Sequence, residues 1–584
     1  MDLVVRNGTL VDGTGAPPRR VDVGVSAGRV VALGDLSAVE AQHVEDAAGL
    51  LITPGFVDLH THYDGQATWD ADLAPSVFHG VTTVITGSCG VGFAPVRVAD
   101  RSKLIALMEG VEDIPGAALA EGIRWNWESF AQYLDFLDQT PHTLELGCLV
   151  PHDALRVYVM GQRGIDQEPA MEADIREMGL VLREALEAGA MGFSTGRTDN
   201  HRSATGARTP ANAAAVDELI GLAGAFSGLG RGVMQAVSDF RMTEGGEHFD
   251  GAFDVIEAMA RAAPDRPTSL SLMQRDGAPE QWRRILRRCE AAVAGGLNLR
   301  VQVAPRGIGV ILGLSCTFHP FIGKRSYQAV AHLPVAERAG RMADPELRRA
   351  ILSEPSQRVA GDGSAIPPLV DTLLASFDRI AFRMFRLEEE PNYEPTLAAS
   401  LGAQARATGR SAAEVVYDVL CEGQGAQLIY FPIFNYGSNN LDLVREMLEH
   451  PLALAGLSDG GAHAGTICDA SFSTFYLSYW ARDRRTDRWP IERAVRFLSG
   501  EPAAHLGLRD RGTLEVGKRA DFNLIDHAAL RILPPEVVDD LPAGGRRLLQ
   551  GAEGYRATFV AGQAVQRDGQ LTGIRPGRVV RSGR

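Results

Sequence analysis

The sequence predicts an α/β protein, a (β/α)8 TIM-like barrel with a small β-sandwich formed by both chain termini. Eight short apolar runs alternate with amphipathic helical patterns through the middle of the chain, and both ends are rich in strand and turn residues. Two closely spaced histidines follow the first apolar run. Barrels of this type carry their chemistry at the carboxyl ends of the strands, which is where these histidines fall.

The two ends of the chain resemble each other. Residues 1–54 contain short strand patterns separated by Asn-Gly, Gly-Thr-Gly and Ala-Gly turns. Residues 505–584 have the same character, in the segments GTLEVGKRADFNLID and YRATFVAGQAVQRDG and in the tail GRVVRSGR. We therefore expect the two ends to form the two parts of one β-sandwich.

The segment between them, residues 55–504, is the predicted barrel. Helical patterns such as 172–190 and 279–296 place Leu, Ile and Val three and four residues apart and end at Gly. The candidate strands are 55–60, 82–86, 145–150, 191–195, 232–237, 269–274, 299–303 and 453–459.

The interval of about 305–450, between predicted strands 7 and 8, is too long for one loop and one helix. It contains several helical patterns and an aromatic run, IYFPIFNYGSNN. We interpret it as a long insertion over the barrel mouth that acts as a lid or faces the substrate.

Composition excludes several classes of function. Lys plus Arg number 58 against 73 Asp plus Glu, and the net charge of −15 argues against a nucleic-acid partner. No run of 18 apolar residues and no signal-peptide pattern occurs, so we expect no membrane partner. The six cysteines lack CxxC spacing, which favours a reducing, cytoplasmic location.

The strongest chemical signal is the pair His60 and His62. Residues two apart on a strand point to the same face, and two imidazoles there form half of a divalent metal site. Asp459, after the last strand, is either an ordinary turn residue or a metal ligand that accepts the proton of an attacking water. Cys89, after the second strand, is either a buried thiol or a further ligand.

Other polar residues follow predicted strands and are candidates for substrate contact. His463 is a candidate for protonating the leaving group. For the five substrate-binding candidates, the alternative is a purely structural role. These substrate-binding candidates are His152, Arg156, Ser194, Arg275 and Arg306.

These motifs together resemble the amidohydrolase superfamily, and within it the N-acyl-D-amino-acid deacylase (D-aminoacylase) branch. The resemblance covers nearly the whole chain, through VVRNGTLVDGTG, PGFVDLHTHYDG, GVTTVITGSCGVGFAP, MGFSTG, LSDGGAH and GTLEVGKRADFNLID. It implies a metal-bearing barrel that hydrolyses a C–N bond with metal-activated water. It also implies that His60, His62 and Cys89 are ligands and that Asp459 is the catalytic carboxylate.

The sequence departs from this branch at two strands. A metal histidine is expected on the fifth strand, where Gln235 and Ala236 stand, and a His-His-Lys run after the sixth, where Leu272, Met273 and Gln274 stand. Three states are open. One metal is held by His60, His62 and Asp459, with or without Cys89; a further ligand comes from elsewhere; or no catalytic metal binds. The candidates for a further ligand are His152, Asp239 and His319.

We favour one Zn²⁺ and an enzyme that cleaves a linear amide C–N bond, most similar to N-acyl-(D-)amino acid deacylases. One alternative keeps the fold but takes a bulky apolar amide or cyclic imide. A second is a non-catalytic, metal-depleted scaffold. The second substrate class is suggested by aromatic residues of the insertion, namely Phe318, Phe321, Tyr327, Tyr430, Phe431, Phe434 and Tyr436. We expect a small-molecule partner, and association into homo-oligomers is left open.

Overall fold

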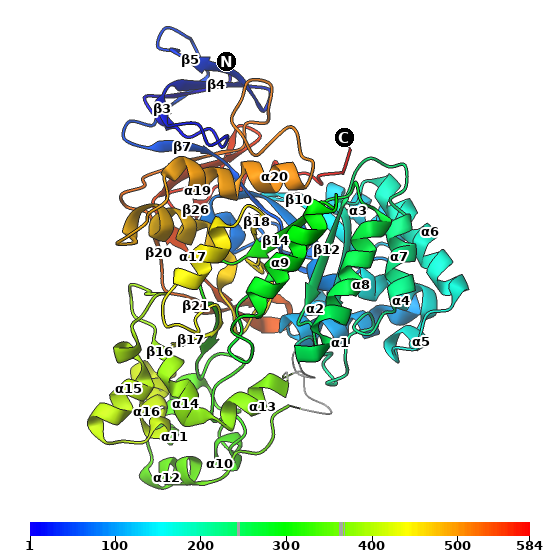
Figure 1. The fold of residues 1–584 in the computed structure, drawn as a ribbon. Helices are drawn as coiled ribbons and strands as arrows, with labels where there is room; N and C mark the ends of the chain where they lie inside the picture. Colours follow the sequence, from blue (N-terminus) through cyan, green and yellow to red (C-terminus); the bar gives the residue numbers. More distant parts are fainter. Residues whose placement is uncertain (242–245, 361–365, 367, 584) are drawn as a thin grey trace.

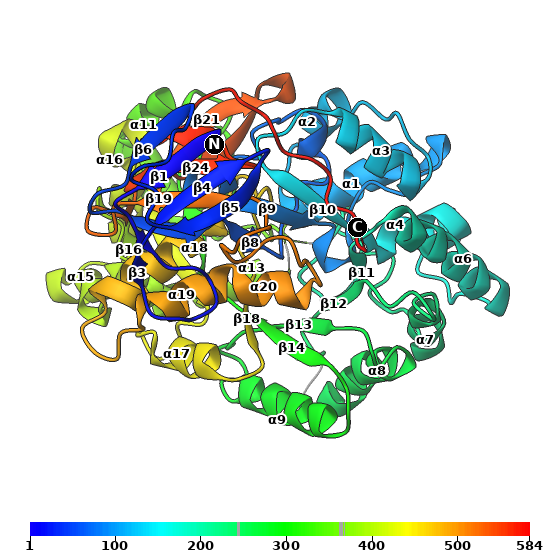
Figure 2. The ribbon, with the colours of Figure 1, turned by 90° about the horizontal axis from the view of Figure 1, so that it is seen from above.

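The computed structural model describes residues 1–241, 246–360, 366 and 368–583, and its centre is a parallel β-sheet. Eight strands form it in the order β18-β14-β13-β12-β11-β10-β9-β8, and each neighbouring pair is parallel. An isolated parallel bridge between Thr61 and Gly460 joins the ends of the two outer strands, and viewed from above the strands run around a ring (Figure 2). The strands are β8 (Phe56–Asp58), β9 (Val81–Thr86), β10 (Glu145–Pro151), β11 (Gly192–Arg197), β12 (Val233–Ser238), β13 (Thr268–Leu272), β14 (Leu299–Val303) and β18 (Ala453–Ala455).

Helices cover the outside of this ring (Figure 1). Apolar residues on their inner faces, such as Leu182 of α6 and Ile285 of α9, are buried in one large core with the strands. The helices between the barrel strands are α1 (Arg101–Glu112), α2 (Gly116–Gly122), α3 (Phe130–Gln139), α4 (His152–Met160), α5 (Gln162–Ile165), α6 (Glu172–Ala188), α7 (Val216–Gly224), α8 (Phe249–Ala262) and α9 (Gln281–Ala294). After the insertion come α17 (Asp442–Glu449), α18 (Phe472–Phe475), a π-helix (Tyr476–Asp483), α19 (Ile491–Leu498) and α20 (Gly500–His505). The predicted (β/α)8 barrel is confirmed.

Both chain ends form the additional β domain at one end of the barrel (Figure 1). Strand β7 pairs antiparallel with β19, so a single sheet holds both termini. A second sheet packs on it through a shared core that includes Val5, Phe522 and Phe559. The larger sheet contains β2 (Thr9–Leu10), β3 (Arg19–Arg20), β7 (Leu51–Pro54), β19 (Phe522–Ile525), β24 (Tyr555–Val560), β25 (Gln563–Arg567) and β26 (Gln570–Leu571). The smaller contains β1 (Leu3–Arg6), β4 (Asp22–Ser26), β5 (Arg29–Gly34) and β6 (His43–Asp46).

The last residues of the chain lie elsewhere than expected. The tail leaves the sandwich and pairs with the barrel, because Gly577 bridges His142 and Val579 bridges Leu146 of β10. The backbone amide of Val580 donates to the Leu146 carbonyl at 2.8 Å. Two further antiparallel strand pairs come before β24 in the chain. They are β20 (Arg531–Ile532) with β23 (Ala552–Glu553) and β21 (Glu536–Leu541) with β22 (Gly545–Leu549).

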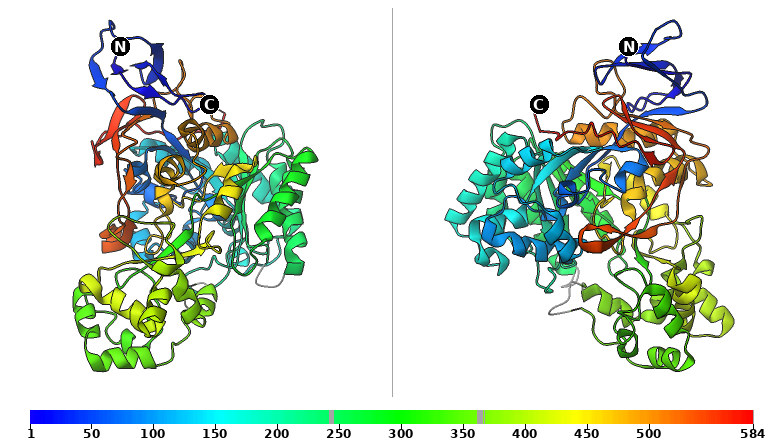
Figure 3. Two further views of the ribbon diagram at one scale, coloured as in Figure 1. Left: turned by 60° about the vertical axis from the view of Figure 1, so that its left-hand side comes forward. Right: turned by 180° about the vertical axis from the view of Figure 1, so that it is seen from behind.

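The insertion between β14 and β18 projects from the barrel end opposite the terminal sheets, as Figures 1 and 3 show. It has its own core, in which Phe321 and Tyr417 are buried, and a three-stranded sheet in the order β15-β17-β16. The aromatic run at 429–434 is the central strand of that sheet. Its elements are β15 (Ile308–Leu312), α10 (Arg325–Gln328), α11 (Val335–Met342), α12 (Pro345–Ser353), α13 (Pro368–Leu374), α14 (Phe377–Ile380), β16 (Phe385–Arg386), α15 (Leu401–Thr408), α16 (Ala412–Gly425) and β17 (Ile429–Phe434). Among the described residues, no helix combines the length and apolar character needed to cross a bilayer.

Candidate metal centre and cavity

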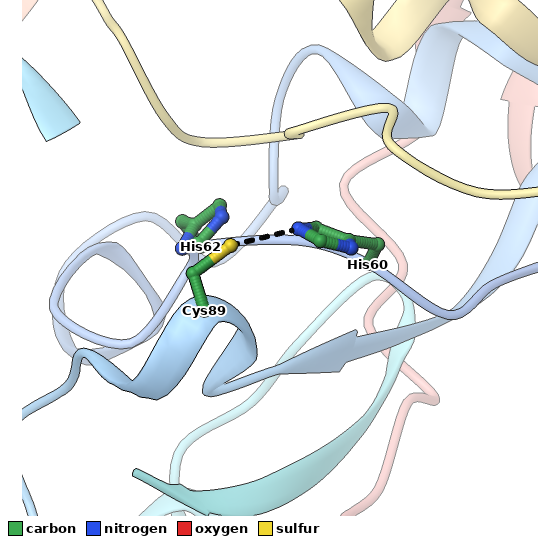
Figure 4. Close-up of side chains that lie close together, drawn as sticks. All are labelled: His60, His62 and Cys89. Atoms are coloured by element: carbon green, nitrogen blue, oxygen red, sulfur yellow. Dashed lines mark hydrogen bonds between the residues drawn. The ribbon is translucent and has the colours of Figure 1, made fainter. Parts of the chain in front are cut away.

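His60, His62 and Cys89 converge at the carboxyl ends of the first two barrel strands (Figure 4). The histidines lie just beyond β8, and Cys89 lies in a one-turn 3-10 segment directly after β9. All three side chains are buried, and one ligand atom from each lies within 4.8 Å of the other two. Asp459 lies beyond β18, which is next to β8 in the closed ring, and it completes the group.

Three of the ligand-atom distances in this group are close to those of a tetrahedral metal site. His60 Nε2 lies 3.2 Å from Cys89 Sγ and 3.3 Å from Asp459 Oδ1, and His62 Nε2 lies 3.6 Å from the same Oδ1. Zinc bonds of 2.0–2.3 Å arranged tetrahedrally separate neighbouring ligand atoms by about 3.3–3.7 Å. Imidazole nitrogen, thiolate sulfur and carboxylate oxygen are also the donor types that zinc takes. The residues present therefore fit one divalent ion.

The tautomer of His60 is set by a side chain of β14. Gln302 of β14 donates from Nε2 to Ser269 Oγ at 2.9 Å, which leaves its Oε1 to accept the Nδ1 proton of His60 at 2.5 Å. With the proton on Nδ1, the Nε2 lone pair points toward Cys89 and Asp459. Orientation of a ligating histidine through its second nitrogen is a general feature of metal sites.

Two strands hold the loop that carries Cys89. The Cys89 amide donates to Gln235 Oε1 of β12 at 3.0 Å, and the Gly90 amide donates to Ser194 Oγ of β11 at 3.0 Å. Gly90 has φ +83°, and a Cβ there would lie 2.6 Å from the Gly196 amide nitrogen. Only glycine allows the loop to approach β11 this closely. Ser194 and Gln235 thus place the thiol rather than contact a ligand themselves.

The loop that carries Asp459 has a strained backbone. Leu457, Asp459 and His463 have φ of +61°, +49° and +47°, in the left-handed region that non-glycine residues rarely adopt. The His62 amide donates to the Gly460 carbonyl at 2.8 Å, which fixes this loop to the first strand. Such strain collects at functional sites, where the surrounding structure enforces it.

Burial controls the ionisation of the group. Burial lowers the pKa of His62 to about 4, so the imidazole is neutral, as a ligand must be. Burial, together with Asp459 and Glu112, raises the pKa of the Cys89 thiol well above its usual value. For Asp459, burial favours the neutral acid, but a hydrogen bond with His62 and the nearby His60 and His463 outweigh it and lower the pKa. Cys89 and Asp459, which are anionic as metal ligands, lie close together here, and a bound cation would stabilise this arrangement.

A cavity of about 280 Å³ extends from the metal centre toward the insertion. His60, His62, Cys89 and Asp459 line one part of it. Its remaining wall is largely apolar and includes residues of β15, α13 and β17, such as Ile308, Val310, Leu373, Phe431 and Phe434. The insertion therefore forms part of the binding cavity.

Two of the predicted substrate or acid–base residues line this cavity, namely Arg275 and His463. Arg275 follows β13; its guanidinium donates to the Ser238 carbonyl at 3.2 Å and lies 5.7 Å from the centre of the Phe434 ring. Burial lowers the pKa of Arg275 to about 10, so it remains a cation at neutral pH. His463 Nε2 lies 3.8 Å from a carboxylate oxygen of Glu112.

The structure places the remaining candidates for substrate contact away from this cavity. His152 and Arg156 are buried against Glu218, with His152 Nε2 2.8 Å from the carboxylate, and neither lines the cavity. The guanidinium of Arg306 lies 3.4 Å from the centre of the Tyr393 ring and 3.3 Å from Asp469. Burial of a charge requires such partners, so these side chains hold the scaffold together. Ser194, as described above, supports the Cys89 loop.

The further ligands considered from sequence do not join the centre. Asp239 accepts hydrogen bonds from the Asp199 and Arg241 amides at a separate small pocket. His319 lies in the insertion, with its ring 4.4 Å from that of Tyr327. Gln274 turns toward the insertion and accepts from the Gly437 amide at 3.1 Å.

Sequence reasoning missed three residues. Gln302 orients His60, His201 lines the cavity, and Glu112 lies 3.1 Å from His62 Nδ1. Glu112 ends helix α1, where a negative charge is unfavourable for the helix dipole. An acid at the carboxyl end of a predicted helix is thus a weak sequence signal that could have drawn attention to it.

Comparisons with known proteins agree with this geometry. Residues 43–566 match a family model described as the amidohydrolase family. The D-aminoacylase of Alcaligenes xylosoxydans xylosoxydans is 28% identical over 583 residues, covering 99% of this chain and 97% of that protein. The N-acyl-D-aspartate deacylase of the same organism is 28% identical over 587 residues, covering 100% and 95%. A solved D-aminoacylase, described by one-metal activation and second-metal attenuation of its binuclear centre, has TM-score 0.64 at 26% identity and covers 99% of both chains.

Proposed function

This chain belongs to the amidohydrolase family, and on that premise we propose that it uses one zinc ion to deacylate N-acyl-D-amino acids. The general class, a hydrolase of carbon–nitrogen bonds other than peptide bonds, comes from the family and its deacylase relatives. The acyl-D-amino-acid substrate is taken from what those relatives are named for. The relative's one-metal activation supports a divalent metal, and the choice of a single zinc ion rests on the ligand set.

One observation carries the proposal. His60, His62, Cys89 and Asp459 come from three separate segments, yet three distances between their ligand atoms, 3.2, 3.3 and 3.6 Å, are close to those in a tetrahedral site. This holds although Gln235 on the fifth strand, and Leu272 and Met273 at the sixth, stand where the related branch is expected to carry histidines. Because Gln235 binds the Cys89 amide and neither Leu272 nor Met273 offers a nitrogen or oxygen ligand, the remaining set favours one metal over two.

Asp459, Arg275 and His463 have separate roles in the proposed hydrolysis. A bound divalent ion would supply Lewis-acid chemistry, lowering the pKa of a water and polarising the amide carbonyl. Asp459, ionised and facing both histidines, accepts the proton of the attacking water and returns it to the leaving amine. Arg275 pairs with the substrate carboxylate through its planar guanidinium. His463 is placed to assist protonation of the leaving group.

The apolar wall of the cavity supports a second candidate. Phe318, Phe431 and Phe434, all from the insertion, line the cavity, so a bulky apolar amide would bury more surface than a small amino acid. The other aromatic residues considered from sequence, Phe321, Tyr327, Tyr430 and Tyr436, lie in the hydrophobic core. A panel that varies the size of the acyl and amine parts separately would distinguish the two substrate classes.

The test combines metal analysis with activity. We expect protein purified without added metal to contain about one zinc per chain, and to hydrolyse N-acyl-D-amino acids in preference to the L-enantiomers. Chelation should abolish turnover, and zinc should restore it. His60→Ala and His62→Ala should lose both metal and activity, whereas His43→Ala, an exposed histidine of the terminal sandwich, should lose neither. Full turnover without metal would reject the proposal, as would unchanged metal content and activity in the two variants. Wild-type protein that binds no zinc and shows no turnover would favour a non-catalytic scaffold.

We also infer a reducing compartment such as the cytoplasm. All six cysteines are unpaired, and four of them are buried. The partner supported by the cavity is a small molecule, and the net charge of −15 disfavours nucleic acid.

A further inference from the structure

We propose that Glu112 is a positioning residue that orients His62 toward the metal and connects it to His463. The inference rests on the proposed metal centre. It adds a carboxylate of helix α1 that neither the sequence resemblance nor the comparisons assign.

Glu112 is fixed by two elements. It is the last residue of α1, and its side chain is 1% exposed. Its carbonyl accepts the Ala464 amide at 3.1 Å, and the Gly465 amide donates to Asp113 Oδ2 at 3.2 Å. The end of α1 is therefore attached to the loop that follows Asp459, and this attachment places the Glu112 carboxylate beside the metal centre.

The two carboxylate oxygens face two different imidazoles. Oε1 lies 3.1 Å from His62 Nδ1, and Oε2 lies 3.8 Å from His463 Nε2. Neither oxygen is aligned as a hydrogen bond with a described residue, although both are buried. A modest rotation of the ring or the carboxylate would convert the first contact into a hydrogen bond.

His60 and His62 show the same division of their nitrogens. In each, Nε2 faces Asp459, and Nδ1 faces a side-chain oxygen behind the ring. Gln302 supplies that oxygen for His60, and Glu112 supplies it for His62. An acceptor at Nδ1 holds the proton there and leaves Nε2 free to bind a cation.

Within the described part of the chain, the buried Asp64 and Asp153 also lack a cationic partner, but they accept hydrogen bonds from Thr86 and Gly87 and from Ala211. The other two buried glutamates of the described residues have arginine partners. Glu218 is paired with Arg156, and Glu145 with Arg511 and Arg519. Among the described residues, the ion pairs of Glu112 are with histidines alone. A buried carboxylate without a cationic partner costs stability, so its presence here is explained by the histidine and the metal it serves rather than by folding.

The experiment compares two substitutions of similar size. Glu112→Gln keeps an acceptor oxygen, as Gln302 provides for His60, and Glu112→Leu removes it. Zinc affinity is measured by competition with a chelator, and unfolding is measured on metal-free protein. We expect Glu112→Leu to bind zinc about 10- to 100-fold more weakly, and Glu112→Gln to stay within about threefold of wild type. Metal-free Glu112→Leu should be at least as stable as wild type.

The matched control is Glu218→Gln, which changes a buried carboxylate that has arginine support. It should lower stability and leave zinc affinity unchanged. Wild-type zinc affinity in Glu112→Leu would overturn the inference, as would a metal-free Glu112→Leu protein that is less stable while its zinc affinity is retained. If the leucine variant does not fold, Glu112→Ala gives the same comparison. Wild-type protein that binds no zinc would instead reject the proposed function.

Discussion

At the scale of single residues, the site depends on the environment of each side chain rather than on its type alone. His152 and His62 are both buried histidines, and burial lowers the pKa of both. Only His62 has its Nε2 directed to a carboxylate at the cavity, whereas both nitrogens of His152 contact Thr195 and Glu218. The same contrast separates Arg275, which lines the cavity, from the enclosed Arg306.

Arg275→Met should weaken substrate binding. A hydrogen bond to a charged group contributes about 1.5–3 kcal/mol, which corresponds to about a 10- to 100-fold rise in KM for substrates with a free carboxylate. Methyl esters of the same substrates should show little change. Arg306→Met is the control, and it should lower stability more than it raises KM. If Arg275→Met changed KM by the same factor for the acid and for its methyl ester, the assignment would be contradicted.

At the scale of elements, loops after neighbouring strands hold one another in place. The Cys89 loop is fixed by β11 and β12, and the Asp459 loop by the first strand and by helix α1. Behind the fourth strand, helices α4 and α7 are joined by the contacts of Glu218 with His152 and Arg156. These contacts involve no ligand, so their effect should appear in stability.

The Glu218 contact predicts a pH-dependent stability. Burial favours the neutral acid, but His152 and Arg156 outweigh it and lower the pKa of Glu218 to about 2. Because this value lies below the usual 4.5, the stabilisation is complete above pH 4.5 and is lost as the pH falls toward 2. At pH 7, Glu218→Gln should cost about 3–5 kcal/mol, since it leaves Arg156 buried without its charge partner.

Urea unfolding of wild type and Glu218→Gln between pH 2 and 7 measures this difference. The gap between the two midpoints should narrow as the wild-type carboxylate becomes protonated. A gap that stays constant down to pH 2 would mean that the carboxylate charge contributes nothing.

At the scale of the whole molecule, the two ends of the barrel have different roles. The metal centre and the cavity lie at the carboxyl ends of the strands, where the insertion forms part of the wall. The C-terminal tail pairs near the amino end of β10, away from the centre. In barrels of this type, the first end carries chemistry and the second carries stability.

Removal of residues 575–584 should therefore lower the thermal midpoint without changing zinc affinity. The deletion removes backbone hydrogen bonds from Gly577 to the His142 carbonyl, from Val580 to the Leu146 carbonyl and from Ser582 to the Gly189 carbonyl. Each contributes about 1 kcal/mol, offset in part by the entropy of ordering the tail. A calorimetric scan and a chelator titration of the same sample test both expectations, and a changed zinc affinity with an unchanged midpoint would contradict them.

The sequence by itself determined the barrel, because each apolar strand and each amphipathic helix can be recognised from neighbouring residues alone. It also pointed to His60, His62, Cys89 and Asp459 as candidate metal ligands, since each follows a recognisable strand, and the fold brings them together. The tertiary structure decided which other polar residues reach that site. Glu112 is separated from His62 by 50 positions and Gln302 from His60 by 242. The contact of α1 with the loop after Asp459 brings the first pair together, and the closure of the ring brings the second. The tertiary structure likewise decided that His152, Arg156 and Arg306 support the scaffold, because a charged residue after a strand can turn toward the cavity or into the core, and the partners that settle the choice lie far away in sequence.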